Sequence, residues 1–365
     1  MHKRRKIIIA VIVIAAAAAL LAFLFRDRVN ITTYKDSKEE GSRVYTIGII
    51  QSRKGSYADQ MVQGSMDAMT DIFGSTHIQF TEKRVTTRDE AKKAAKQMVK
   101  QNKDLILTSG TRALMGAEDA TTTVPILSTG VVNFQRALGM TVSEDWDYRT
   151  GRNVTGVSGE PSLPDTLSML IEVTPDLKTV GLIRDPSVPD SVYQCNKMKA
   201  MLDEAGIASK TYNLSRTSTD WDAASLGQTA VSECSALYFP MYCGLAQQAK
   251  VIAPIAAEAG VSTVAGDAAV GKNVLATLYT DPYNQGYRAG RMAYSILVKG
   301  SKPKRMHVKI FESSASQKLY QKTIAAQMNR NFPKSFSEIG DYLANYDPTL
   351  VTTRINAGVT QPGKD

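Results

Sequence analysis

The sequence predicts an α/β protein with two Rossmann-like lobes, each built on a parallel sheet, preceded by an N-terminal transmembrane helix. Short apolar runs alternate with amphipathic helical segments along most of the chain. This alternation occurs twice in succession, and 365 residues are enough for two domains. Close to the N-terminus, a stretch of 19 residues carries no charge.

Residues 1–28 form the expected membrane anchor. The uncharged stretch covers residues 7–25, and a helix of that length spans roughly 28 Å, close to the hydrocarbon thickness of a bilayer. The basic residues at positions 3–6 keep the N-terminus in the cytoplasm, so the rest of the chain is exported. A cleaved signal peptide is the alternative, but Leu20–Phe25 is a poor cleavage site, and no cysteine follows that could carry a lipid. An uncleaved anchor is favoured, followed by a polar tether over residues 29–43.

The first lobe is expected over residues 44–158. Uninterrupted apolar strands are typical of parallel sheets that helices cover on both faces. Strands are predicted at 45–51, 77–80, 104–107 and 124–127, with helices at 57–73 and 88–102.

The second lobe, expected over residues 159–281, repeats this order. Its predicted strands are 179–183, 236–239, 262–264 and 274–278, and its helices are 163–173, 191–205 and 245–259. A helix at 282–298 begins a segment, up to about residue 345, that we expect to complete the first lobe, and 346–365 form a polar tail. A ligand cleft is expected between the lobes, at the carboxyl ends of the strands.

Charge and composition exclude several classes of protein. The net charge of +9 resides in the two ends, because residues 1–43 and 301–365 each carry +5, which leaves −1 for the body. A nucleic-acid-binding protein would concentrate basic charge on its folded surface, so no nucleic-acid partner is expected. Three scattered histidines do not suggest a metal site, and no cofactor or enzyme motif is present. Cys234 and Cys243 flank a predicted strand, so no disulfide is expected between them.

Four fragments, in this order, carry a resemblance to a known family. They are GRNVTGVS (151–158), LIRDPSVPDS (182–191), VAGDAAVGKNVLATL (264–278) and GYRAGRMA (286–293). Over roughly residues 44–342 the sequence resembles the bacterial ABC-transporter substrate-binding family that includes tryptophan- and other aromatic amino-acid-binding proteins. The resemblance implies the class I periplasmic-binding-protein fold, a monomer that closes about a small solute by hinge bending, and the membrane-embedded permease subunits of an ABC importer as partners.

The loops after the predicted strands supply the candidate ligand-binding residues. Helix N-termini in such loops suit a carboxylate, because their N–H groups are free and the helix dipole is positive there. Ser109 and Thr111 could hold a carboxylate, and Asp267, with Asp190, an ammonium. The same residue types also serve turns and helix caps. The expected ligand-binding residues are Ser52, Ser56, Ser109, Thr111, Thr129, Val131, Ser187, Asp190, Ser191, Tyr242 and Asp267.

The sequence departs from the family where ligand contacts are expected. Met241-Tyr242-Cys243 replaces a usual Thr-Asp-Asn, Val131–Phe134 replaces a usual Val-Thr-Asp-Pro, and residues 138–150 resemble an insertion. The solute therefore stays open, and Tyr242 and Phe134 could stack on an apolar solute or pack within the protein. A membrane-anchored ligand sensor of the same fold, signalling through a partner protein, is the alternative function.

Overall fold

The computed structural model describes residues 43–52, 55–143, 145–310 and 316–346. These residues belong to a compact unit that extends over Arg43–Pro348. The expected anchor, the tether before Arg43 and nearly all of the tail lie outside the described residues. Within the described part, no helix combines the length and the apolar character that a membrane span requires.

The first lobe is a five-stranded parallel sheet in the order β2-β1-β3-β4-β5. Its strand β5 falls in the fragment that carried the family resemblance, although no strand was predicted there. Strands that are neighbours in the sheet are separated in the sequence by connecting helices, because parallel strands need such a crossover connection. The strands are β1 (Tyr45–Gln51), β2 (Ile78–Arg84), β3 (Leu105–Ser109), β4 (Ile126–Val131) and β5 (Val154–Ser158).

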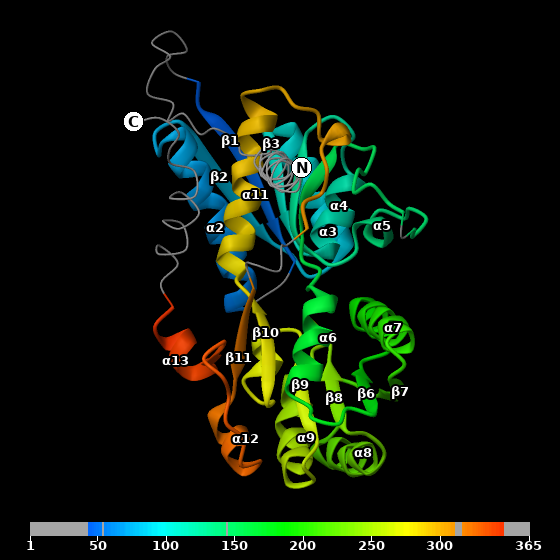
Figure 1. Cartoon of the computed structure of the whole chain (residues 1–365). Coiled ribbons are helices and arrows are strands. Elements are labelled where there is room, and N and C mark those ends of the chain that lie inside the picture. Colours follow the sequence, from blue (N-terminus) through cyan, green and yellow to red (C-terminus); the bar gives the residue numbers. More distant parts are fainter. Residues whose placement is uncertain (1–42, 53–54, 144, 311–315, 347–365) are drawn as a thin grey trace, which may run out of the picture. The chain divides into compact units, whose positions relative to one another are not determined.

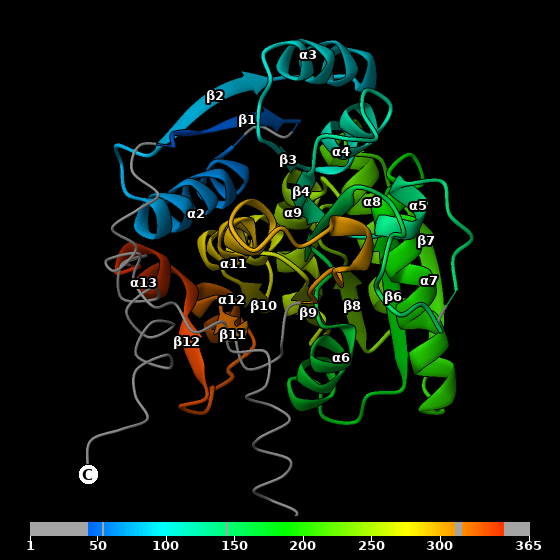
Figure 2. The same ribbon diagram turned by 90° about the horizontal axis from the view of Figure 1, so that it is seen from above.

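Helices cover both faces of this sheet, as Figure 2 shows. On one face α2 (Ser56–Phe73) and α11 (Pro282–Leu297) pack against alternate residues of β1 and β3. On the other face lie α3 (Arg88–Lys100), α4 (Thr111–Glu118) and the short α5 (Phe134–Ala137). Burial on both faces explains why these strands are apolar throughout.

Helices α2 and α11 approach closely because small residues lie at their contact. A Cβ atom added at Gly286 would lie 1.8 Å from the carbonyl oxygen of Met61, and one at Gly64 would lie 2.1 Å from that of Tyr283. Two tyrosine hydroxyls of α11 donate to aspartates of α2, Tyr283 to Asp67 at 2.8 Å and Tyr287 to Asp71 at 2.9 Å. These contacts hold α11 against the first lobe.

The second lobe contains a seven-stranded sheet in the order β12-β11-β10-β9-β8-β6-β7 (β6 to β11 are labelled in Figure 1, and β12 in Figure 2). Helices α6 (Leu163–Glu172) and α7 (Pro189–Glu204) pack on one face, and α8 (Asp220–Glu233) and α9 (Ala246–Glu258) on the other. The strands are β6 (Thr179–Arg184), β7 (Ala208–Asn213), β8 (Ala236–Phe239), β9 (Ser262–Ala265), β10 (Ala276–Thr280), β11 (Ser316–Tyr320) and β12 (Phe336–Glu338).

The two-lobed α/β fold is confirmed, but two details of the prediction are wrong. The second sheet is not wholly parallel, because β11 runs antiparallel to β10. Residues 282–345 do not all complete the first lobe: α11 and residues 307–309 do, whereas β11 and β12 extend the second sheet. The buried Leu319 and Phe336 explain this placement, since they join the apolar clusters of the second lobe. The chain therefore passes between the lobes after β5, after β10 and between Ile310 and Ser316.

Candidate ligand-binding site

Strands β1, β3 and β4 of the first lobe end in register. Gln51 is paired with Ser109, and Ser109 with Thr129. The N–H and the hydroxyl of Ser52 both donate to the carbonyl oxygen of Ser109, at 2.9 and 3.2 Å, and the N–H of Gly110 donates to that of Thr129 at 2.9 Å. The structure thus brings together Ser52, Ser109 and Thr129, which lie far apart in the sequence.

Two hydroxyl groups at the start of α4 are buried without a hydrogen-bond partner among the described residues, those of Ser109 and Thr111. The residue Ser109 is 0% exposed. Between them Gly110 has a φ of 93°, in the region that favours glycine, and no described side chain caps the helix. A buried, unpaired hydroxyl is costly, so this helix start is suited to an acceptor supplied from outside, such as a carboxylate.

Among the remaining residues expected to bind ligand in the first lobe, Thr129 and Val131 contact other residues of the protein. The hydroxyl of Thr129 points to the sulfur of Met61, 3.8 Å away. Val131 is 0% exposed and belongs to the apolar core, and its carbonyl oxygen accepts hydrogen bonds from Ser158 and Gly159. Val131 is therefore a packing residue in this structure. Ser56 begins α2, and its side chain is outside the described atoms.

The loop between β6 and α7 is organised around the buried Asp185. Its carboxylate accepts from the N–H and hydroxyl of Ser187 and from the N–H of Arg216, while its own N–H donates to Ser191. Burial alone would raise the pKa of Asp185, but these hydrogen bonds outweigh it and lower that pKa. Ser187 and Ser191 therefore stabilise the loop, whereas Asp190 lies in the first turn of α7.

Asp267 uses both of its carboxylate oxygens on backbone N–H groups. One oxygen accepts from Val270 at 3.0 Å and caps the short helix α10 (Ala268–Gly271), and the other accepts from Tyr242 at 2.8 Å. Tyr242 has a φ of 59°, a conformation that few side chains adopt without support. Asp267 thus holds the loop after β8 in place, a role that the sequence pattern did not reveal.

Tyrosines from both lobes meet beside these loops. The ring of Tyr57, in the first turn of α2, lies edge-on to that of Tyr242, with 5.6 Å between centroids, and its hydroxyl donates to the carbonyl oxygen of Thr280 at 3.1 Å. Burial, reinforced by the neighbouring Tyr242, raises the pKa of Tyr57 well above its ordinary value. Sequence reasoning missed Tyr57, because an aromatic residue at the start of a helix carries no signal of its partner.

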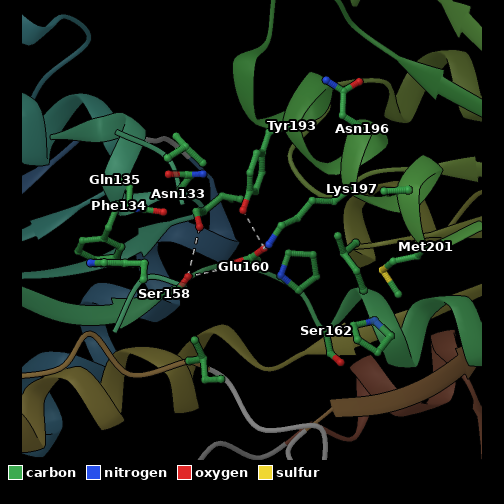
Figure 3. Close-up of a pocket in the computed structure, with 18 of the residues that line it drawn as sticks. Asn133, Phe134, Gln135, Ser158, Glu160, Ser162, Tyr193, Asn196, Lys197 and Met201 are labelled. Atoms are coloured by element: carbon green, nitrogen blue, oxygen red, sulfur yellow. Dashed lines mark hydrogen bonds and ion pairs between the residues drawn. The ribbon is translucent and has the colours of Figure 1, made fainter. Parts of the chain in front are cut away.

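A cavity of about 1000 Å³ lies between α5 and α7 (Figure 3). It is bounded by residues 132–135, Val142, Ser143, Trp146 and Tyr148 of the first lobe, by Ser158 and residues 160–162 of the crossing segment, and by α7. Lys197 and Tyr193 of α7 contact one carboxylate oxygen of Glu160 at 3.0 and 3.3 Å. Burial alone would lower the pKa of Lys197, but Tyr193 and Glu160 outweigh it and raise that pKa. None of the expected ligand-binding residues is among the described residues that line this cavity.

The described part of the chain offers little support for a metal site or for a reactive thiol. No group of three or more histidine, cysteine or acidic side chains there could hold a metal ion. The three cysteines, Cys195, Cys234 and Cys243, are buried and free. Burial raises the pKa of the Cys195 thiol to about 12, so this thiol is poorly suited to nucleophilic chemistry.

Comparison with protein families gives a match to the family of ABC transporter substrate binding proteins over residues 46–335. The chain belongs to this family. The resemblance seen in the sequence is thereby confirmed, and so is a role as an ABC-type substrate-binding protein.

One curated relative matches the chain at low sequence identity. A tyrosine-binding protein of Clostridioides difficile (strain R20291) is 26% identical over 204 residues, which cover 56% of this chain and 57% of that protein. The chain thus matches little more than half the length of this curated relative.

Two solved structures have the same fold. A ligand-free, open substrate-binding protein with adhesive properties from Clostridium difficile has a TM-score of 0.70 and 22% identity, covering 81% of this chain and 99% of its own. A Streptococcus pneumonia protein described as an ABC domain in complex with L-Trp has a TM-score of 0.65 and 22% identity, covering 80% and 97%.

Proposed function

We propose that this protein is the extracytoplasmic solute-binding component of an ABC importer, and that its solute is an amino acid or a related small carboxylate. Family membership supports the class of function. The observation that supports the type of solute is the start of α4, where the buried hydroxyls of Ser109 and Thr111 have no partner among the described residues. The tyrosine-binding relative is consistent with such a solute.

The proposed site lies between the lobes, where Tyr57 and Tyr242 meet. The carboxylate accepts hydrogen bonds from the start of α4, and the rest of the solute contacts the loops after β8 and β9. The chain segments that connect the lobes act as hinges, so that closure excludes water and strengthens the polar contacts. Asp267 supports this site by holding the backbone of Tyr242, and its negative charge favours an ammonium group nearby.

The remaining parts of the proposal follow from this role. The protein is a monomer, is not an enzyme, does not bind nucleic acid, and delivers its solute to permease subunits in the membrane. Residues 1–28 anchor it to the outer face of that membrane. Nothing among the described residues favours the alternative of a sensor that signals through a partner.

Calorimetry with matched ligands tests the type of solute. The purified protein is unfolded and refolded to remove any bound solute, which mass spectrometry identifies in the released fraction. Each of the twenty amino acids is then titrated into the refolded protein. Those that bind are compared with the amines that lack the carboxylate, such as tyramine for tyrosine and tryptamine for tryptophan.

We expect binding that depends on the carboxylate. Loss of a charge-assisted hydrogen-bond partner in a closed site costs on the order of 2–5 kcal/mol, so the amine should bind at least about 30-fold more weakly than the amino acid. Equal affinity of amine and amino acid would overturn the carboxylate assignment. A co-purified solute without any carboxylate would overturn it independently of which amino acids were tested.

A further inference from the structure

A second cavity, of about 440 Å³, lies in the first lobe at the amino ends of β4 and β5. Pro125 directly precedes β4 and Asn153 directly precedes β5, and both residues line this cavity. Ser109 and Thr129 of the proposed solute site lie toward the opposite, carboxyl ends of β3 and β4. Strand β4 has six residues and is therefore about 17 Å long. The second cavity and the solute site thus lie at opposite edges of one sheet.

Basic side chains surround the second cavity, and two of them are unpaired. Lys302 and Lys304 line it, are exposed, and form no hydrogen bond or ion pair with a described residue. Arg152, the third basic residue of the wall, pairs with Glu118, the only acidic residue among the described residues that line the cavity. Three basic residues and one acidic residue leave a net charge of +2. The cavity therefore favours an anionic occupant.

The walls of the second cavity also offer hydroxyl donors on a well-held loop. Thr122 and Ser301 line the cavity, and their hydroxyl groups form no hydrogen bond with a described residue. The side-chain amide of Asn153 donates to the carbonyl oxygens of Thr121 and Val124, at 3.1 and 2.7 Å, and so fixes the loop before β4. Ammonium groups together with hydroxyl donors match the oxygen atoms of a phosphate group.

The chain from the expected membrane anchor enters the first lobe at this same edge of the sheet. Arg43, the first described residue, donates to the carboxylate of Asp104 at 2.8 Å, and Asp104 directly precedes β3. The expected tether, residues 29–43, can span at most about 50 Å even when fully extended. An anchor at residues 1–28 therefore keeps the edge that carries the second cavity near the membrane surface.

We propose that the second cavity, with Lys302 and Lys304, binds the phosphate headgroup of an anionic phospholipid in the membrane that holds the protein. This inference rests on the proposed function only in that residues 1–28 anchor the chain. The volume of about 440 Å³ is within the range of small-molecule sites. Each lysine close to an anionic bilayer strengthens binding about fivefold. While this contact is made, the carboxyl edge of the sheet, with the solute site, faces away from the bilayer.

Energy transfer in reconstituted vesicles tests this contact with the full-length protein. Ser75→Cys places a donor dye in an exposed turn before β2, at the same edge of the sheet, and Ser75 is not among the described residues that line the cavity. The three native cysteines are buried, so the introduced thiol is the one that reacts. Acceptor dyes on lipid headgroups then report how close this edge lies to the bilayer. Vesicles of phosphatidylcholine alone are compared with vesicles that also contain phosphatidylglycerol.

Two pairs of lysine substitutions separate the cavity from charge in general. Lys302→Gln with Lys304→Gln removes two unpaired charges at exposed positions, so the fold should be preserved. Lys250→Gln with Lys322→Gln is the matched control, because these lysines are exposed, form no ion pair with a described residue and lie in the second lobe.

We expect phosphatidylglycerol to increase energy transfer, and salt to reverse the increase. The ratio of docked to undocked protein should fall about 25-fold in the Lys302→Gln, Lys304→Gln variant and less than about twofold in the control. Equal transfer in the two kinds of vesicle, or an increase that the first variant retains, would overturn the proposal.

Titration of inorganic phosphate into the detergent-solubilised protein separates the lipid from a free anion. Tight phosphate binding that the Lys302→Gln, Lys304→Gln variant loses, combined with transfer that is independent of phosphatidylglycerol, would assign the cavity to a free phosphate and overturn the lipid assignment. Retention of the protein in vesicles of phosphatidylcholine alone tests the anchor independently of the cavity. Amino-acid binding should be unchanged in both variants, so failure of this contact is distinguishable from failure of the solute site.

Discussion

Replacing Ser109 by alanine should have opposite effects on the stability of the empty protein and on its affinity for the solute. The residue Ser109 is 0% exposed, and its hydroxyl has no hydrogen-bond partner among the described residues. A buried polar group without a partner costs about 1–3 kcal/mol. Ser109→Ala removes that cost and leaves the backbone contacts with Ser52 in place, so the solute-free protein should become more stable by about 1 kcal/mol.

The same change removes a donor to the carboxylate of the solute. A hydrogen bond to a charged group contributes about 1.5–3 kcal/mol, so affinity should fall by about 10- to 150-fold. Differential scanning calorimetry of the solute-free protein measures the first effect, and titration calorimetry with the amino acid that binds best measures the second. Ser225→Ala, at an exposed position of α8, is the control and should change neither quantity.

The reasoning is refuted by either of two results. If Ser109→Ala lowers the stability of the solute-free protein, the Ser109 hydroxyl has a hydrogen-bond partner in solution and is not available to a ligand. If affinity is unchanged while stability rises, the buried hydroxyl is simply tolerated, and the carboxylate binds elsewhere.

Further changes give equally direct expectations. Asp267→Asn should destabilise the protein by about 1–3 kcal/mol, because an amide has one acceptor oxygen where two N–H groups now bind; unchanged thermal stability would contradict this. Asp281 is buried at the start of α11, and burial raises its pKa above the ordinary 3.8. The stability that it contributes is therefore present below that pH and lost as pH rises through the raised pKa, so Asp281→Asn should raise the melting temperature at pH 7 and lose this advantage below about pH 3.8. Gly286→Ala should destabilise by about 2–4 kcal/mol, since the added Cβ would lie 1.8 Å from the carbonyl oxygen of Met61; native-like stability would show that α2 and α11 can separate easily. The three buried cysteines should react with Ellman's reagent only after denaturation, and rapid labelling of the native protein would contradict their burial.

Strands such as β3 and β8 were predictable from sequence, whereas β7 and β11 were not, because the two groups differ in burial. Strands such as β3 and β8 are buried on both faces, and every residue in them is covered, which produces an apolar run. Strand β7 is at the edge of its sheet and mostly exposed, so its sequence ASKTYN has no apolar run. Strand β11 has one fully buried residue, Leu319, and its antiparallel pairing with β10 depends on chain crossings that no local pattern encodes.

The sequence predicted which loops contain the candidate site residues, but it did not predict the role of each residue. Strand ends of a parallel sheet meet at one edge, so the neighbourhood of Ser52, Ser109 and Thr129 followed from strand order alone. Asp267 and Ser191 have the residue types of ligand contacts, but the same types also hold loops together, and only the hydrogen bonds decide. The partners of Asp267 are 3 and 25 residues away in the chain, and a contact between residues 25 positions apart leaves no recognisable sequence pattern.

By itself the sequence determined the class of this protein: two α/β lobes and a family. These features follow from local periodicity and from short motifs, which depend on neighbouring residues. Tertiary structure alone decided that Val131 is packed in the core, that Asp267 supports Tyr242, and that a cavity lies between α5 and α7. The physical reason is that burial, hydrogen bonding and cavity walls depend on side chains brought together from both lobes, and their separation along the chain leaves no periodic trace.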